Sequence, residues 1–317
     1  MKTTIDLVSA ALREKDQFLI LTHRRPDGDT IGSAVALCLG LRAAGKRAYL
    51  AENEDLTPRL MPFAERYLAP ASFKPETIVA VDIADTALLC GSAAHLAERI
   101  DIAIDHHPSN KDYAAMTYVE PKAAATGEII WRLFSGWEME KEFYQALYVA
   151  VATDTGCFKF SNTTPLSHLI AAECITQGID FHAINKEFFT KKTKARFQIE
   201  RMLFDSMQFA ADGKVVGTYL TRAVIDGVGA DNDDMENLAT LTMQIENVMC
   251  GMVLTENKQG GSFKASVRTH APLDASRICA VFGGGGHARA AGCTLEGDGE
   301  TCCRRLMEAA EEQLAHV

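Results

Sequence analysis

The sequence predicts an α/β protein with two domains: an N-terminal parallel sheet flanked by helices, and a smaller α+β domain behind it. Three observations along the 317 residues support this prediction. Strand-like and helix-like segments alternate through residues 1–185, a charged helical linker follows at 186–208, and short β-like runs dominate 209–317. A chain of this length, with 47% hydrophobic residues, can bury a separate core in each domain.

The first strand-like segment leads into a group of polar side chains. An apolar run at 18–21 ends just before His23, and a loop marked by proline and glycine then carries Asp27 and Asp29. A helix is predicted over 30–44, and its first turn directs free N–H groups and a positive dipole end towards a bound phosphate. Helix capping would explain one aspartate, but not two together with a histidine.

Three further apolar segments also end at residues that can bind metal ions. The run 77–81 ends at Asp82, and a predicted buried strand at 100–104 leads into residues 105–107, Asp-His-His. A fourth run ends close to Asp154, and its periodicity leaves open whether it is a strand or a helix. Taken singly, each of these residues could be a turn or capping residue.

The ends of the four segments are expected to lie close together. In an open α/β sheet the carboxyl ends of the strands converge on one crevice, where ligands bind. Carboxylate oxygens and imidazoles together suit Mn²⁺, Mg²⁺ or Fe²⁺, and no cysteine joins the set to favour structural zinc. The sequence therefore predicts a divalent-metal site at this edge of the sheet.

The C-terminal domain carries a second candidate site around a run of glycines. Residues 283–286 are all glycine and precede His287, while a strand predicted over 262–269 carries Arg268. Glycines allow a positive φ and close backbone approach, so this run can form an anion-binding nest. A flexible hinge is the alternative, but the nearby histidine and arginine favour ligand binding.

In this order the motifs resemble those of the DHH phosphoesterase superfamily. His-x3-Asp-x-Asp begins at His23, and Asp82, the Asp-His-His of 105–107 and Asp154 follow. The glycine run with its histidine is similar to the GGGH motif of the DHH-associated C-terminal domain, with Ala-Ala-Gly at 290–292 behind it. The resemblance covers nearly the whole chain, and it is strongest to the stand-alone NrnA-type group of oligoribonucleases (nanoRNases) and pAp phosphatases.

The resemblance implies a role for each of these residues. One group would hold one metal ion: His23, Asp27 and Asp82. A second group would hold the other ion, with Asp82 as the bridge: Asp29, Asp82, His106 and Asp154. His107 would lie near the scissile phosphate, and Asp105 would orient a ligating imidazole. Substrate would be bound from the C-terminal domain by these residues: Arg268, Gly283, Gly284, Gly285, Gly286 and His287. Arg289 departs from the family pattern and is expected to be solvent-exposed.

The expected activity is metal-dependent hydrolysis of phosphoester bonds. Two ions about 3.5–4 Å apart can hold a bridging hydroxide and clamp the phosphoryl oxygens for in-line displacement. The resemblance implies that short oligonucleotides and linear dinucleotides such as pApA are cleaved to nucleoside monophosphates, that pAp loses its 3′-phosphate, and that the metal is Mn²⁺. A cyclic-dinucleotide phosphodiesterase, a manganese pyrophosphatase and an inactive nucleotide-binding sensor are the alternatives. The GGGH motif favours nucleotides, and the complete ligand set favours an enzyme.

Composition limits the partners and the location. A net charge of −10 argues against a broad track for long duplex nucleic acid, and the basic patch at 191–196 is expected to be a solvated part of the linker. Nine cysteines without C-x-x-C spacing suit a reducing cytoplasm. The N-terminus predicts an amphipathic helix and no signal peptide, and no apolar run reaches the roughly 20 residues of a membrane span. A homodimer is left open.

Overall fold

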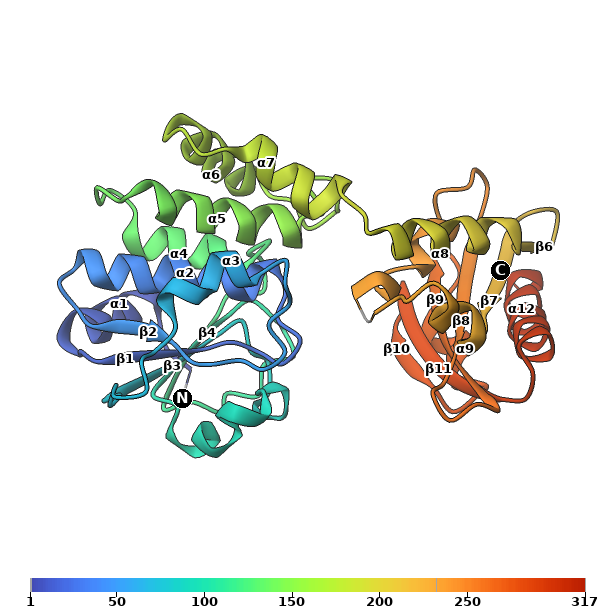
Figure 1. The fold of residues 1–317 in the computed structure, drawn as a ribbon, viewed down its shortest axis with the longest axis horizontal. Coiled ribbons are helices and arrows are strands. Elements are labelled where there is room, and N and C mark those ends of the chain that lie inside the picture. Colours follow the sequence, from blue (N-terminus) through green and yellow to red (C-terminus); the bar gives the residue numbers. More distant parts are fainter. Residues whose placement is uncertain (1, 232, 317) are drawn as a thin grey trace. The chain divides into compact units, whose positions relative to one another are not determined.

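The chain divides into two compact units, Met1–Lys191 and Lys192–Val317 (Figure 1). The structure, a computed structural model, describes residues 2–231 and 233–316. Each unit has its own sheet and its own hydrophobic core. The predicted fold class, a parallel-sheet α/β domain followed by a second domain with a mixed sheet, is therefore confirmed.

The N-terminal unit is built on a five-stranded parallel sheet with the order β2-β1-β3-β4-β5. Its strands are β1 (Phe18–Leu21), β2 (Ala48–Leu50), β3 (Thr77–Val81), β4 (Ile102–Asp105) and β5 (Met116–Val119). The strand order reverses direction at β1, because β2 lies on one side of it and β3 on the other. The two short edge strands, β2 and β5, lie outside the predicted runs.

The α-helices pack on one face of this sheet, and the 3-10 turn Gly91–Arg99 packs on the other. The helices are α1 (Ile5–Glu14), α2 (Gly28–Ala43), α3 (Met61–Ala64), α4 (Thr126–Phe134), α5 (Lys141–Asp154), α6 (Pro165–Thr176) and α7 (Phe181–Asn185), with 3-10 turns at Glu65–Tyr67, Thr86–Leu88 and Gly91–Arg99 and a π turn at Lys186–Thr190. Figure 1 shows α2, α4 and α5 stacked on one face, with α6 outside α5. The apolar run before Asp154 belongs to α5, so this aspartate ends a helix and not a strand.

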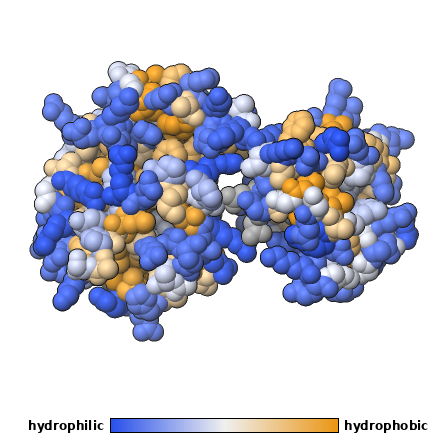
Figure 2. Space-filling model, in the orientation of Figure 1, coloured by the Kyte–Doolittle hydropathy of each residue, from blue (hydrophilic) through white to orange (hydrophobic). Residues whose placement is uncertain are grey.

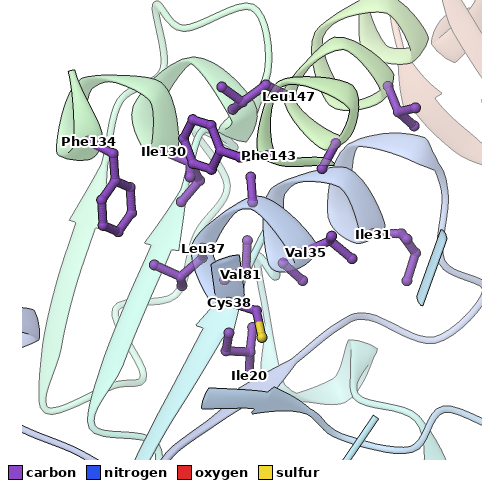
Figure 3. Packing of buried hydrophobic residues seen from close by; sticks show 14 of the residues in the cluster. Ile20, Ile31, Val35, Leu37, Cys38, Val81, Ile130, Phe134, Phe143 and Leu147 are labelled. Atoms are coloured by element: carbon purple, nitrogen blue, oxygen red, sulfur yellow. The ribbon is translucent and has the colours of Figure 1, made fainter. Parts of the chain in front are cut away.

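Alternate side chains of the strands enter two apolar clusters, one on each face of the sheet. Ile20 and Val81 point towards α2 and its neighbouring helices (Figure 3). Leu19 and Ile78 point the other way and pack with Leu96 of the Gly91–Arg99 turn. Strands that are buried on both faces in this way hold their carboxyl ends in fixed positions.

Glycines allow α2 to lie very close to α5. A Cβ at Gly32 would be 2.5 Å from the carbonyl oxygen of Ala146, and one at Gly28 would be 2.4 Å from the side chain of Thr153. Both distances are shorter than any tolerable contact, so only glycine fits at either position. This packing brings the first turn of α2, which carries Asp29, beside the last turn of α5.

The C-terminal unit contains a six-stranded sheet with the order β10-β11-β9-β8-β7-β6. Its strands are β6 (Gln208–Ala210), β7 (Val215–Leu220), β8 (Cys250–Glu256), β9 (Ser262–Thr269), β10 (Gly285–His287) and β11 (Ala290–Glu296), and only β7 and β8 pair in parallel. Its helices are α8 (Lys194–Asp205), α9 (Arg222–Gly227), α10 (Ala239–Thr242), α11 (Ala275–Ala280) and α12 (Gly299–Ala315), with a 3-10 turn at Asp233–Met235. One face packs against α11 and α12, and part of the other against α8, α9 and α10.

Three cations of the basic patch at 191–196 pair with nearby carboxylates. Lys191 pairs with Glu187 at 3.0 Å, while Lys192 and Arg196 both pair with Glu200, at 2.5 and 2.7 Å. These cations therefore serve the local structure. Arg289, near the other end of the chain, is exposed and donates a hydrogen bond to the carbonyl of Leu273.

Three further observations concern the surface, the cysteines and the length of the helices. Figure 2 shows hydrophobic residues gathered over α6, where Leu169 and Ile175 are exposed. All nine cysteines are free thiols. Across residues 2–231 and 233–316, no helix is both long enough and apolar enough to cross a membrane.

Candidate metal centre and active site

The predicted metal ligands gather at the carboxyl edge of the N-terminal sheet, where its strand order reverses. In doubly wound sheets this switch point is the usual position of the ligand crevice. His23 follows β1 and Asp82 follows β3, the two strands that meet at this point. Asp82 has a left-handed backbone (φ 62°), a conformation that aspartate tolerates better than most residues, and its carboxylate lies close to His23 and His106.

One group of possible ligands consists of His23, Asp27 and Asp82. The Nε2 atom of His23 lies 3.8 Å from Asp27 Oδ1 and 3.8 Å from Asp82 Oδ2. The other ring nitrogen, Nδ1, hydrogen-bonds with the carbonyl of Arg24 at 2.8 Å. This contact fixes the ring and leaves Nε2 as the free donor atom for a metal.

A second group surrounds His106. Its Nε2 atom lies 3.8 Å from Asp29 Oδ2, 3.6 Å from Asp154 Oδ2 and 3.6 Å from Asp82 Oδ1. Its Nδ1 hydrogen-bonds with the carbonyl of Ala123 at 3.1 Å, so this imidazole is fixed in the same way as that of His23. The two oxygens of Asp82 therefore face different histidines, which is the arrangement that a bridging carboxylate requires.

The cluster concentrates negative charge away from solvent. Asp29 and Asp82 are 1% and 3% exposed. Burial raises the pKa of Asp82 well above its usual range, and the charge of Asp29 raises it further. Burial and the charge of Asp154 likewise raise the pKa of Asp29. Within the described part of the chain these three carboxylates form ion pairs only with histidines, so a bound cation is what would let them ionise together.

Several residues that the sequence analysis missed hold these carboxylates in place. The backbone N–H groups of Thr126 and Gly127 donate to Asp29, at 2.7 and 3.1 Å, and the hydroxyl of Ser33 donates to it at 2.8 Å. The hydroxyl of Thr126 donates to Asp82 at 2.8 Å. Thr126 and Gly127 begin α4, so the positive end of that helix faces the cluster. A predicted helix start at this point would have been the available signal.

Asp105 and His107 form a pair that adjoins the cluster, because His107 Nδ1 also lies 3.5 Å from Asp82 Oδ1 and His107 forms a third possible ligand group with Asp82 and His106. The carboxylate of Asp105 is fully buried and accepts hydrogen bonds from His107 Nδ1 at 2.8 Å and from the side chain of Asn110 at 2.7 Å. The hydrogen bond that His107 donates to Asp105 raises the pKa of His107 above its ordinary value despite partial burial. The ring that Asp105 holds is thus that of His107, whereas Ala123 holds the ring of His106.

The C-terminal unit brings Arg268 and His287 onto one face of its sheet. Arg268 of β9 pairs with Ala290 of β11, and Ala290 pairs with His287 of β10, so the three side chains project from the same side. The next row on this face consists of Ser266, Gly292 and Gly285. Arg268 is half-buried, which lowers its pKa, and within the described residues it forms no ion pair with a carboxylate.

The glycine run differs from position to position. A Cβ at Gly284 would lie 2.3 Å from the carbonyl oxygen of Gly292, and one at Gly286 would lie 2.7 Å from that of Ala290. These two glycines are therefore needed for the close packing of the β10–β11 hairpin. A Cβ at Gly283 or Gly285 would meet no atom, so the backbone there is open to a ligand.

A parallel sheet with carboxylates and imidazoles at its switch point, in a chain whose second unit carries a half-buried arginine beside an exposed histidine, defines a class of metal-dependent α/β enzymes. Residues 17–153 match the DHH family, N-terminal domain, and residues 212–316 match the DHHA1 domain. The chain belongs to the DHH family. It is accordingly a hydrolase that acts on phosphoester bonds.

The matches to individual relatives cover more than nine-tenths of the chain. The bifunctional oligoribonuclease and PAP phosphatase NrnA of Thermus thermophilus is 31% identical over 303 residues, which cover 94% of this chain and 90% of that protein. The cyclic-di-AMP phosphodiesterase PdeA of Listeria monocytogenes is 24% identical, and the match covers 92% of this chain but 47% of PdeA. An exopolyphosphatase-related protein from Bacteroides fragilis has the same fold, with a TM-score of 0.84, 24% identity and coverage of 97% and 95% of the two chains.

Proposed function

We propose that the protein cleaves short oligonucleotides, including linear dinucleotides such as pApA, to nucleoside monophosphates and removes the 3′-phosphate of pAp. The observation that carries this proposal is the buried Asp82 carboxylate, whose two oxygens face His23 and His106. The Thermus relative, whose name records both activities, matches this chain over 94% of its length. An intact candidate site and a full-length relative together favour these substrates.

The residues present fit two divalent cations. His23, Asp27 and Asp82 would hold one, and Asp29, His106 and Asp154 would hold the other together with Asp82. Two bound cations supply Lewis-acid activation of water and neutralise charge on the phosphoryl group. We expect Mn²⁺ to serve better than Zn²⁺, because oxygen and imidazole donors without thiolates suit it.

His107 is the residue that we assign to the proton and charge changes at the phosphate. Its Nδ1 is occupied by Asp105, so Nε2 is the atom that would donate to the leaving oxygen or stabilise the phosphoryl charge. The buried Asp105 keeps the ring oriented and favours its protonated form. Thr126 and Ser33 would keep the ligand carboxylates fixed while substrate binds.

Arg268 and His287 would bind the nucleotide. Both project from the same face of the C-terminal sheet, and the small Ala290 between them leaves space for a base or a phosphate. A Cβ at Gly283 or Gly285 would meet no atom, so a phosphate would have room to approach the backbone closely there. Binding energy from a group remote from the reacting phosphate lowers KM or orients the substrate without taking part in the chemistry.

A panel of substrates tests the proposal. Purified protein with Mn²⁺ would be given linear dinucleotides, pAp, cyclic dinucleotides and pyrophosphate at equal concentrations. We expect rapid release of mononucleotide from pApA and of phosphate from pAp. Preferential turnover of a cyclic dinucleotide would point to the activity named for PdeA, and preferential turnover of pyrophosphate would contradict a nucleotide substrate. Tight nucleotide binding without turnover would instead indicate a sensor.

A further inference from the structure

The segment that follows Asp154 has an unusual backbone. Gly156, Cys157 and Phe158 all adopt left-handed conformations, with φ values of 56°, 58° and 63°. Consecutive left-handed residues are unfavourable for amino acids that carry a Cβ, so neighbouring contacts must hold this turn. The turn begins two residues after a proposed metal ligand.

Hydrogen bonds and packing keep the turn in place. The N–H of Cys157 donates to the carbonyl of Ala152 at 2.7 Å, and that of Phe158 donates to Thr155 Oγ1 at 3.1 Å. The ring of Phe158 points inward and stacks on His168, with ring centroids 5.2 Å apart. The strained conformation is therefore part of the fold and not a loose surface loop.

The same segment is fastened to the backbone of the metal cluster. The side chain of Asn162 donates to the carbonyl of Asp154 at 3.1 Å and to that of Ala124 at 3.0 Å. Ala124 follows Ala123, whose carbonyl holds the ring of His106. Residues 156–162 are thus tied at both ends to the backbone that positions Asp154 and His106.

Two neighbouring side chains of this turn are exposed to solvent. Phe160 is 58% exposed, although an apolar ring so close to the core could have been buried. The edge of the ring contacts Gly156, where an added Cβ would lie 2.4 Å from the ring, and this contact fixes the position of the ring. Lys159 is exposed and, among the described residues, forms no ion pair.

We propose that Phe160 and Lys159 bind substrate at the rim of the metal cluster. The ring of Phe160 stacks on a nucleobase, and the ammonium of Lys159 contacts a phosphate that is not cleaved. Stacking on an aromatic ring tolerates any base, and a lysine contacts phosphate without reading sequence, so the pair would accept short oligonucleotides of mixed sequence. This inference rests on the proposed function, because only a nucleotide substrate carries both groups.

Replacement of the ring tests the stacking. Phe160→Ala should raise KM for pApA roughly tenfold or more while kcat changes little. The loss should vanish with one of two pApA analogues, each of which lacks a single base. Phe160→Trp should retain wild-type KM. Phe209→Ala, which removes a similarly exposed ring from β6, is the matched control and should leave KM unchanged.

Replacement of the lysine tests the phosphate contact. Lys159→Met should raise KM for pApA and reduce the salt dependence of log KM by about one unit of slope, whereas Lys159→Arg should keep both values. Lys141→Met is the matched control, because Lys141 begins α5 and lies about 20 Å along the helix from Asp154. It should change neither KM nor the slope.

The wild-type rate separates this inference from the proposal on which it rests. Wild-type protein that hydrolyses pApA, together with Phe160→Ala and Lys159→Met variants of unchanged KM, would overturn the inference and leave the proposed function standing. A uniform fall in kcat, equal for pApA and both abasic analogues, would also overturn it, because Phe160 would then be only structural. Wild-type protein without turnover of pApA would overturn both.

Discussion

The two candidate sites differ in how firmly their side chains are held. At the edge of the N-terminal sheet, the two oxygens of buried Asp29 accept hydrogen bonds from Ser33, Thr126 and Gly127. On the C-terminal sheet, the side chain of Arg268 hydrogen-bonds only with the adjacent Val267 carbonyl among its described contacts, and His287 is exposed. One site is fixed before any ligand arrives, whereas the other stays accessible.

This difference matches the work that each site would do. Groups that take part in a reaction must be held in one geometry, because small displacements are costly. Groups that bind substrate must remain open to it and can adjust as it binds. Changes at the first site should therefore abolish the reaction on every substrate, while changes at the second should alter the choice among substrates.

Removal of metal should have the largest effect. With EDTA the carboxylate cluster would lose its counter-charge, and activity on pApA and on bis(p-nitrophenyl) phosphate should fall to background. Added Mn²⁺ should restore more activity than added Zn²⁺. Both rates would be followed by product release. Full turnover in excess chelator would refute the metal mechanism.

Asp82→Asn should come next, with a loss of at least about a thousandfold, or roughly 4 kcal/mol of transition-state stabilisation, on both substrates. The cost falls on metal geometry and not on packing. In the metal-free protein, the midpoint of thermal unfolding should be unchanged or slightly higher, because the substitution removes a buried carboxyl group whose pKa is already raised. A variant that keeps the wild-type rate would show that the strand ends do not form one site.

Arg268→Ala should separate the two sites. Loss of a charge-assisted contact should cost about 2–4 kcal/mol in kcat/KM for pApA and pAp. Bis(p-nitrophenyl) phosphate is too small to use that contact and should be hydrolysed nearly as before. Equal losses on all three substrates would make Arg268 structural or directly catalytic, and no loss on any would leave the C-terminal face without a role in recognition.

Thr126→Val should have a smaller effect on both substrates, about tenfold in kcat/KM. The substitution keeps the shape and the backbone N–H but removes the hydroxyl that positions Asp82. Thr77→Val is the matched control, because this buried threonine lies at the start of β3, at the opposite end of the strand from Asp82. Kinetics that match this control would mean that Asp82 needs no support from Thr126.

The smallest effect should lie outside both sites, in α8 of the C-terminal unit. Burial opposes the charge of Glu200, but hydrogen bonds from Lys192 and Arg196 outweigh it and lower the pKa. A lowered folded-state pKa gives stability that is present above the unfolded value of about 4.5 and is lost as pH falls further. Glu200→Gln should therefore lower the unfolding free energy by about 1–2 kcal/mol at pH 7.

Two measurements check this last expectation. Urea unfolding of the wild-type protein and of Glu200→Gln should give unfolding free energies that differ less at pH 3.5 than at pH 7. KM for pApA should be unchanged in Glu200→Gln. A changed KM with unchanged stability would instead assign the basic patch to substrate binding.

The sequence predicted the parallel-sheet domain and the candidate metal ligands because each signal is local. His23 and Asp82 directly follow apolar strands, and three such strand ends fall at one edge of a sheet. Asp154 is different, because it ends the helix α5. Close packing of α5 on Gly28 and Gly32 brings this aspartate near the strand ends. That packing depends on tertiary structure and leaves little trace in periodicity.

Other features leave no signal in the residue types themselves. The donors to Asp29 from Thr126 and Gly127 are backbone N–H groups, which any residue possesses, so composition does not reveal them. The end of the glycine run forms β10 by pairing with β11, although glycine is a poor strand former. The exposure of Phe160 and its contact with Gly156 depend on tertiary packing, so the sequence does not predict them.

Calorimetric titration of Mn²⁺ into metal-free protein tests the central claim most directly. The claim is that the two histidine-centred groups joined by Asp82 form a dinuclear site before substrate binds. We expect two Mn²⁺ ions for each chain in the wild-type protein, with both affinities weakened in Asp82→Asn. A single ion for each chain, or two ions whose affinities do not respond to Asp82→Asn, would contradict it.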